Sequence, residues 1–273
     1  MTWNRGSDDE SEIIAGTSKD LRHVFVTYSD DDGETWKQPE NISKSASRRT
    51  WHWYATGPGN GIQLTRGKHV GRLVIPTNHS DHAPMTETEE AKYRHVSESF
   101  YRSHVIYPDD HGETWKIGGV LDRLTNESTI VELPDGSLLN NMRSYEKIDR
   151  RTVARSDDGG STWSPVVPHH QLVEPTCQGN MLRYSFPSAT SKSRILFSNP
   201  ASPQKRERLT VRVSYDEGKT WPVSKLIYEP SAAYSCMTVL ADGPAGVLFE
   251  RDGYGKISFA KFGMEWLEKP VSP

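Results

Sequence analysis

The sequence predicts an all-β protein whose sheets repeat as blade-like units arranged radially. Three observations lead to this prediction. An eight-residue motif of the form S-x-D-x-G-x-T-W occurs four times, and a short β-rich run precedes each copy. The 273 residues include 21 Gly, 17 Pro, 8 Trp and 11 Tyr, with no long helical pattern. Many turns, aromatic anchors and a repeat of blade length are typical of radial sheet proteins.

The repeated motif has the chemistry of a tight turn. Its Asp accepts backbone N–H groups, its Gly supplies a positive φ, and its Trp packs between neighbouring sheets. The tryptophans stand at 36, 115, 163 and 221, so the copies are 79, 48 and 58 residues apart; the copy at 108–115 has Pro108 in place of Ser. We expect the motif acids to serve the fold and not catalysis: Asp31, Asp110, Asp158 and Asp216.

The first half of the chain divides into three parts. Residues 1–42 predict a polar acidic loop at 7–10 and then a strand pair that ends in the first motif. Residues 43–53 read as a basic, aromatic loop, and 54–59 are too rich in Gly and Pro for a helix. Within 61–120, strands are expected at the following ranges: 61–64, 72–76 and 103–107.

The segment between the last two of these strands is polar. Residues 78–98 predict an exposed loop. Its histidines, His79, His82 and His95, with His104 beyond, fit no metal-ligand spacing, so we expect them at the surface.

The second half repeats the same pattern. Residues 127–168 and 177–225 each give strand, turn, strand and motif, with strands at 194–199 and 209–214. The last unit, 234–266, has strands at 247–249 and 257–262 but no motif, and it opens at Tyr234 after a turn at Pro230 and Ser231. We therefore expect about five blade-sized units, all in a single domain spanning residues 1–273.

Composition excludes several classes of function. The net charge is −3 and the pI is about 6.4. The chain therefore has no excess of basic residues of the kind that would suggest a nucleic-acid partner. The sequence contains no run of about 18 apolar residues, the length that would suggest a membrane span. Cys177 and Cys236 form neither a metal spacing nor a disulfide framework and are expected to be free, buried thiols. No secretory signal precedes the first strand, and compartment and oligomeric state stay open.

One hairpin brings opposite charges together. Residues 124–143 read as strand, Pro-Asp-Gly turn and strand, with Glu127 at the start of one arm and Arg143 at the end of the other. Arg206, just before a strand, and Tyr234, at the start of the last unit, hold similar positions in other units. Strand ends of this kind meet near the axis of a propeller. Taken singly, these residues could equally be a cross-strand ion pair, a solvated cation and a structural aromatic.

Together these segments resemble a known family. The stretches NES-x-x-VELPDGSLL-x-N-x-R, NPASP-x-x-R, AYS, YATGPGNGIQL and GRLVIP-x-x-H, interleaved with the Asp-box (BNR) motifs, look like exo-α-sialidases of glycoside hydrolase family 33 over nearly all of the chain. The resemblance implies a six-bladed sialidase-like β-propeller that acts on sialylated glycans, without cofactor or metal. It implies that Tyr234 is the nucleophile and Glu127 its partner base. Arg143 and Arg206 resemble two of the three arginines that hold the sialic acid carboxylate.

The family pattern has two further residues without a counterpart here, a first arginine and an aspartate that acts as general acid/base. With the abrupt start at Met1, this suggests a chain truncated at the N-terminus by about one blade, with open sheet edges and exposed apolar surface. We expect such a chain to be impaired as a hydrolase. Two alternatives remain: a non-catalytic sialoglycan-binding propeller that keeps the carboxylate clamp, and an Asp-box propeller of unrelated role.

Overall fold

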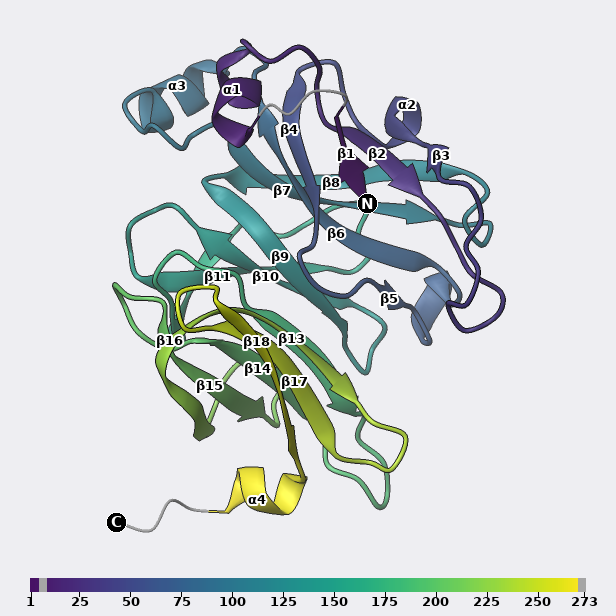
Figure 1. The fold of residues 1–273 in the computed structure, drawn as a ribbon, viewed down its shortest axis with the longest axis vertical. Coiled ribbons are helices and arrows are strands. Elements are labelled where there is room, and N and C mark those ends of the chain that lie inside the picture. The colour runs from purple at the N-terminus through teal and green to yellow at the C-terminus, as the bar shows by residue number, and fades with distance from the viewer. Residues whose placement is uncertain (5–8, 270–273) are drawn as a thin grey trace.

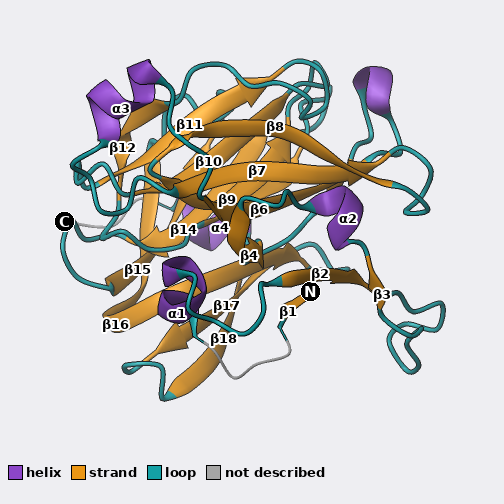
Figure 2. Cartoon of the chain, turned by 90° about the horizontal axis from the view of Figure 1, so that it is seen from above, coloured by secondary structure: helices purple, strands orange, loops and turns teal. Residues whose placement is uncertain are grey.

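Within residues 1–4 and 9–269, which the computed structural model describes, five antiparallel sheet units follow one another along the chain (Figure 1). They run from the N-terminal strands at the top of Figure 1 to the C-terminal strands at its bottom, and Figure 2 shows the same units from above. The chain is nearly all β, and the expected all-β architecture of about five units is confirmed.

The first two units form the N-terminal half. The first contains β1 (Thr2–Trp3), β2 (His23–Val26) and β3 (Glu40–Asn41). The second contains β4 (Trp51–Thr56), β6 (Leu73–Asp81), β7 (Tyr101–Pro108) and β8 (Trp115–Arg123), with β5 (Ile62–Gln63) paired to the start of β6. Short helices lie in the connections: α1 (Glu10–Ala15), α2 (Ser43–Ala46), the 3-10 turn Gly67–His69 and α3 (Glu87–Tyr93).

The remaining units form the C-terminal half. The third contains β9 (Thr125–Glu132), β10 (Leu138–Ser144), β11 (Arg150–Ser156) and β12 (Val167–Val173). The fourth contains β13 (Asn180–Ser185), β14 (Arg194–Pro200), β15 (Glu207–Ser214) and the first part of β16 (Val223–Val239). The fifth contains the second part of β16, β17 (Ala245–Arg251) and β18 (Lys256–Phe262), followed by α4 (Met264–Glu268).

The strand β16 joins two units without a break. Its first part pairs with β15 and its second part with β17, and the register shifts between Ala232 and Ser235. The turn expected at Pro230 and Ser231 is therefore wrong, because the chain passes through these residues in extended conformation. Irregular pairing of this kind bends a strand and re-aims its side chains. Tyr234 lies within this irregular stretch.

The motif turns have the expected hydrogen bonds. In the third unit, the Asp158 carboxylate accepts the Thr162 backbone N–H at 2.8 Å and the Thr162 hydroxyl at 2.6 Å. Gly160 has a φ of 92°, a conformation that favours glycine. The tryptophans differ from one another: Trp221 is buried between sheets, as expected, whereas Trp36 is 62% exposed and its indole N–H bonds only its own turn, at Gly33 O.

Apolar clusters fill the spaces between neighbouring units. Val74 and Val105 of the second unit meet Ile130 and Leu138 of the third. The third and fourth units share a cluster around Phe197. Burial of this apolar area is the main stabilising contribution to the sheet stack. It holds the units in fixed relative positions, and so fixes where the strand ends meet.

The polar segment expected at 78–98 is only partly a loop. β6 continues to Asp81, and Thr86 caps α3 through a hydrogen bond to the Glu89 N–H. His79 and His104 are fully buried, so their expected surface position is wrong, whereas His82 and His95 are exposed. The polar composition of this segment gave the wrong prediction because both buried histidines stand on strands. There they form a hydrogen bond with each other, with their Nδ1 atoms 2.9 Å apart.

The acidic loop expected at residues 7–10 also needs correction. Residues 7 and 8 lie outside the described residues. Asp9 caps α1, accepting the Glu12 N–H at 3.0 Å, and Glu10 begins the helix. A carboxylate at this position satisfies an otherwise free helix N–H group, which explains why an acidic run starts a helix here.

Candidate active site

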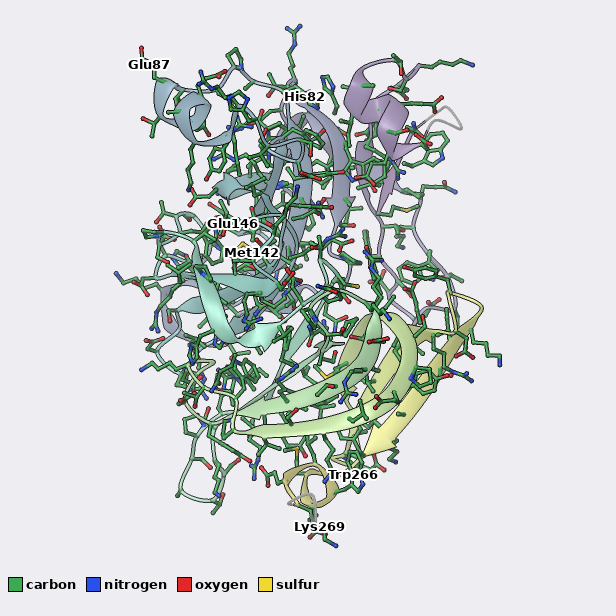
Figure 3. The ribbon with its side chains drawn as sticks, turned by 90° about the vertical axis from the view of Figure 1, so that its left-hand side faces the viewer. His82, Glu87, Met142, Glu146, Trp266 and Lys269 are labelled. Atoms are coloured by element: carbon green, nitrogen blue, oxygen red, sulfur yellow. The ribbon has the colours of Figure 1, made fainter. Side chains whose placement is uncertain are left out.

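The hairpin of β9 and β10 places two opposite charges at one end of the third unit. The turn at its other end is closed by Asp135, whose carboxylate accepts the Ser137 N–H at 3.0 Å. Pairing of Ser128 with Met142 brings the far ends of both arms together. There Arg143 Nη1 donates to Glu127 Oε2 at 2.8 Å. Figure 3 shows Met142 and Glu146, which stand on either side of Arg143 in the chain, between Glu87 of α3 above and Trp266 of α4 below.

The second oxygen of the same carboxylate has a different partner. The Tyr234 hydroxyl, from β16, donates a short hydrogen bond to Glu127 Oε1. The irregular pairing of β16 turns the Tyr234 backbone toward Glu250, whose Oε2 accepts the Tyr234 N–H at 3.1 Å. Glu127 therefore joins a phenol and a guanidinium that stand 91 positions apart in the chain (234 − 143).

Arg206 approaches the phenol from the fourth unit. It immediately precedes β15, and its Nη2 donates to Thr176 O at 3.2 Å while its Nη1 donates to the Tyr254 hydroxyl at 2.8 Å. Its guanidinium carbon lies 5.8 Å from the centroid of the Tyr234 ring. All four residues singled out in the sequence, Glu127, Arg143, Arg206 and Tyr234, are thus brought together by three different units.

Burial and charge act on the site together. Burial, the charge of Glu127 and the hydrogen bond to it all raise the pKa of Tyr234 above its ordinary value of 10. Burial lowers the pKa of Arg143, but Glu127 outweighs this effect and the pKa is raised. At neutral pH the site therefore holds a neutral phenol and a charged guanidinium.

Arg143 has donor capacity that the protein does not use. Its side chain is 13% exposed and that of Glu127 is 12% exposed. Its Nε atom is buried and has no protein partner. A guanidinium with free donors next to an accessible site is suited to bind a carboxylate through two parallel hydrogen bonds.

Further residues at the site escaped the sequence reasoning. Tyr145 lies beneath Arg143, with its ring centroid 4.9 Å from the guanidinium carbon, and burial raises its pKa to about 12. Tyr145 stands just past the end of β10, so strand alternation did not point to it. Cys177 lies close by, and burial raises the pKa of its thiol to about 12. Its position beside the arginines left no signal in the sequence.

A cavity of about 210 Å³ lies beside Tyr234. Polar groups line one part of it, from Gln178, Ser235 and Glu250, while Leu248 and Ile257 supply an apolar part. Gln178 is itself fixed, since its Nε2 donates to Ser235 O at 2.9 Å. The cavity surface is mostly apolar with a few polar groups, as in sites that bind small organic molecules.

No group of three or more His, Cys, Asp or Glu side chains in the described part of the chain is arranged to hold a metal ion. Among residues 1–4 and 9–269, no helix is long and apolar enough to cross a bilayer.

Comparison with known proteins gives consistent relatives. A family model of the BNR repeat-like domain matches residues 12–247. The sialidase of Micromonospora viridifaciens is 35% identical over 256 residues, which is 92% of this chain and 37% of that protein. The exo-alpha-sialidase of Aspergillus fumigatus is 31% identical over 274 residues, which is 93% of this chain and 59% of that protein.

A solved structure agrees with these sequence relatives, and the expected sialidase-like propeller fold is confirmed by it. The structure of the Hadza microbial sialidase Hz136 superposes with a TM-score of 0.75 at 30% identity, covering 90% of this chain and 45% of that one. The chain therefore spans between about a third and three fifths of the length of these three proteins.

Proposed function

Because the chain belongs to the family of BNR repeat-like domains, we propose that it works as an exo-α-sialidase, which releases terminal sialic acid from glycoconjugates with retention of configuration. One observation carries this proposal: the Tyr234 hydroxyl donates to Glu127, whose other carboxylate oxygen is paired with Arg143. We further propose that residues 1–273 form a single propeller domain.

The two arginines suit the charge of the substrate. Sialic acid carries a carboxylate on its anomeric carbon, and a guanidinium binds a carboxylate through two N–H donors at any working pH. Arg143 has a buried Nε without a protein partner, and Arg206 approaches Tyr234 from the neighbouring unit. In the proposed complex both guanidiniums face the substrate carboxylate.

The phenol suits the reacting carbon. An anionic nucleophile would be repelled by the carboxylate on that carbon, whereas a neutral phenol is not, and sialidases use tyrosine where most glycosidases use a carboxylate. In the proposed step, Tyr234 Oη forms a bond to the anomeric carbon while its proton passes to Glu127. The bond to the glycan oxygen breaks with its electron pair. Water then forms a bond to the anomeric carbon while the bond to Tyr234 Oη breaks. The phenolate takes its proton back from Glu127, the proton of the water passes to solvent, and this second inversion restores the configuration.

Departure of the glycan oxygen requires a proton from an acid. In the family that this sequence resembles, an aspartate supplies this proton, and a third arginine completes the carboxylate clamp. No residue of this sequence matches either motif. We propose that the 273-residue chain by itself binds sialic acid but turns over slowly, because the leaving group is not protonated and the clamp has two arginines.

Calorimetric titration of the purified chain with N-acetylneuraminic acid tests the binding part of this proposal. Loss of a charge-assisted hydrogen bond costs about 1.5–3 kcal/mol, so Arg143→Ala weakens affinity by about ten-fold or more. Arg155→Ala is the matched control, because Arg155 belongs to the same sheet and pairs with Asp135 at the opposite end of the hairpin. Equal affinity in wild type and Arg143→Ala would contradict the proposed clamp.

Turnover of a fluorogenic sialoside tests the catalytic part. Rates comparable to those of ordinary glycosidases would contradict the impaired activity of this chain. The chain keeps two arginines of the clamp but has no counterpart of the acid or of the third arginine. This combination also favours a second candidate, a non-catalytic sialoglycan-binding propeller. Sialic acid binding that depends on Arg143, with no turnover at all, would favour this candidate.

A further inference from the structure

A fully buried ion pair lies behind the site and has no part in the proposed chemistry. Arg151 Nη1 donates to Glu174 Oε2 at 2.7 Å, and the two side chains are 0% and 1% exposed. Removing both charges from water is costly, and replacing such pairs with apolar residues is often neutral or stabilising. Stability alone therefore gives a weak reason for an ion pair at this position.

Arg151 holds the strand that carries Arg143. Its Nε donates to the side-chain oxygen of Asn141 at 2.6 Å, and its Nη2 donates to the Asn141 backbone oxygen at 3.3 Å. Asn141 stands two residues before Arg143 on β10. The Arg151 guanidinium thus fixes β10 on the N-terminal side of Arg143.

Glu174 holds the same strand on the other side of Arg143. Its Oε1 accepts the backbone N–H of Ser144 at 2.7 Å. The pairing of β10 with β9 shifts register between Met142 and Ser144, so the ladder is irregular at the residue that carries the guanidinium. A buried carboxylate bond at this point replaces regular pairing and defines the local backbone.

The same pair holds the loop that Arg206 contacts. Arg151 Nη1 also donates to Cys177 O at 2.7 Å, while the preceding carbonyl, Thr176 O, accepts from Arg206 Nη2 at 3.2 Å. Thr176 has a φ of 51°, a left-handed conformation that β-branched residues rarely adopt. The hydrogen bonds from Arg206 to Thr176 O and from Arg151 to Cys177 O keep the loop in this conformation.

We propose that the Arg151–Glu174 pair is a positioning device that sets the distance and orientation of Arg143 relative to Arg206. Arg143 is held through Asn141 and Ser144, and Arg206 through the carbonyls of residues 176 and 177. The inference rests on the proposed function, since the geometry so fixed is that of a clamp for one planar carboxylate. Bidentate recognition requires such fixed geometry, because a flexible fork loses binding free energy to ordering.

Arg151→Lys and Glu174→Gln separate this role from general stability. A lysine keeps the charge but cannot reach Asn141, Glu174 and Cys177 together, because it lacks the planar fork. Glutamine keeps an acceptor for the Ser144 N–H and should retain most of the geometry. Arg183→Met is the control, since Arg183 forms a mostly buried pair with Glu217 at a motif turn, away from the clamp.

The deciding measurement is the ¹⁵N NMR spectrum of the arginine Nε–H groups, without ligand. The signals of Arg143 and Arg206 are assigned by their loss in Arg143→Lys and Arg206→Lys. If the Arg151–Glu174 pair positions the two arginines, Arg151→Lys speeds solvent exchange of the Nε protons of Arg143 and Arg206 by about ten-fold. This is the effect of losing one charge-assisted hydrogen bond. Glu174→Gln has a smaller effect, and Arg183→Met has none. Unchanged signals in folded Arg151→Lys overturn the proposal, whatever happens to binding.

The affinity for N-acetylneuraminic acid then distinguishes the two proposals. Arg151→Lys should weaken binding by about ten-fold although it contacts no ligand. If the wild type binds no N-acetylneuraminic acid while its arginine signals depend on Arg151, the proposed function fails and the positioning role stands. If the wild type binds but the signals do not respond, the positioning role fails alone.

Discussion

A single carboxylate organises the site at the scale of residues. Glu127 accepts from Tyr234 on one oxygen and from Arg143 on the other. Burial raises the pKa of Tyr234, and so do the negative charge of Glu127 and its hydrogen bond. Tyr234 therefore stays neutral at rest and has a proton acceptor within hydrogen-bond reach.

This coupling gives a measurable pKa difference. Glu127→Gln removes the negative charge that disfavours the phenolate and leaves Arg143 nearby, so we expect the pKa of Tyr234 to fall below its wild-type value. A pH titration of ¹³Cζ-labelled tyrosine followed by NMR measures it. Glu250→Gln is the control, because Glu250 contacts only the Tyr234 backbone N–H. A Tyr234 pKa that is equal or higher in Glu127→Gln would contradict the arrangement.

The order of the sequence motifs that resemble the family located these four residues. Local pattern alone left each of them open, and Tyr234 stands inside the continuous β16 and not after a turn. Arg151 and Glu174 gave no such signal. Their importance arises from burial against residues 141, 144 and 177, which only tertiary structure defines.

At the scale of elements, the motif turns close the strand pairs of the units. The motif was predicted correctly as a turn because its hydrogen bonds are local, from Asp to a residue four positions later. The packing of its tryptophan was not local, and the prediction therefore failed for Trp36. The number of strands in each unit likewise depends on pairing between distant segments, which local sequence patterns do not define.

The structural role of the motif acids can be tested in the third unit. Asp158→Ala removes two hydrogen bonds to Thr162, and we expect a loss of about 1–3 kcal/mol in the free energy of unfolding. Urea denaturation measures this loss. Asp157→Ala is the control, since that side chain is 83% exposed. A stability equal to wild type, or lost sialic acid binding in the folded Asp158→Ala protein, would argue against a purely structural role.

The second unit contains a buried histidine pair that links stability to pH. His104 Nε2 lies 2.9 Å from the Tyr54 hydroxyl, which itself donates to Ala46 O. This contact assigns the His104 proton to Nε2, so His104 Nδ1 accepts from His79 Nδ1. Burial first, then neighbouring positive charges, hold both pKa values well below 6.5.

The sign of the pH dependence follows from these directions. Above pH 6.5 both histidines are neutral in the folded and unfolded chain, and stability is complete. Below it, the unfolded chain binds protons that the folded chain excludes, so stability falls by up to about 1.4 kcal/mol per pH unit for each group. His79→Phe keeps a ring against Trp51 and removes one of these groups.

Urea denaturation between about pH 7.5 and pH 5 measures the effect. His79→Phe should show a shallower loss of stability with acidification than wild type. His95→Gln, at an exposed position, should match wild type. Identical slopes in wild type and His79→Phe would show that the buried pair does not control acid stability.

At the scale of the whole molecule, the site depends on how the units are stacked. Glu127 and Arg143 come from the third unit, Arg206 from the fourth, and Tyr234 from the strand that joins the fourth to the fifth. The radial arrangement was predictable from the repeat period, and so was the meeting of the strand ends. The continuous β16 was not, because Pro and Ser in sequence indicate a turn, while pairing on both of its edges keeps it extended.

The stack has apolar outer faces among the described residues. On the last unit, Leu248 pairs with Phe259, and both are about half exposed, next to exposed Ile257. Met1, Trp3 and Trp36 are exposed on the first unit and its loops. Exposed apolar side chains thus occur on both the first and the last of these units.

Covalent trapping tests the central claim, that Tyr234 attacks the anomeric carbon of sialic acid. A sialosyl fluoride with a second fluorine at C3 is the suitable reagent. Fluoride leaves without a proton from a general acid, so the reaction does not require the aspartate that has no counterpart here. The C3 fluorine destabilises positive charge at the anomeric carbon, which slows release of the glycosyl-enzyme formed by nucleophilic catalysis.

Mass spectrometry of the proteolysed, trapped protein gives the result. The account predicts one sialosyl adduct, on the peptide that contains Tyr234, absent from Tyr234→Phe and reduced in Glu127→Gln. An adduct on Glu127 or elsewhere, or no adduct in a chain that binds N-acetylneuraminic acid, would contradict it.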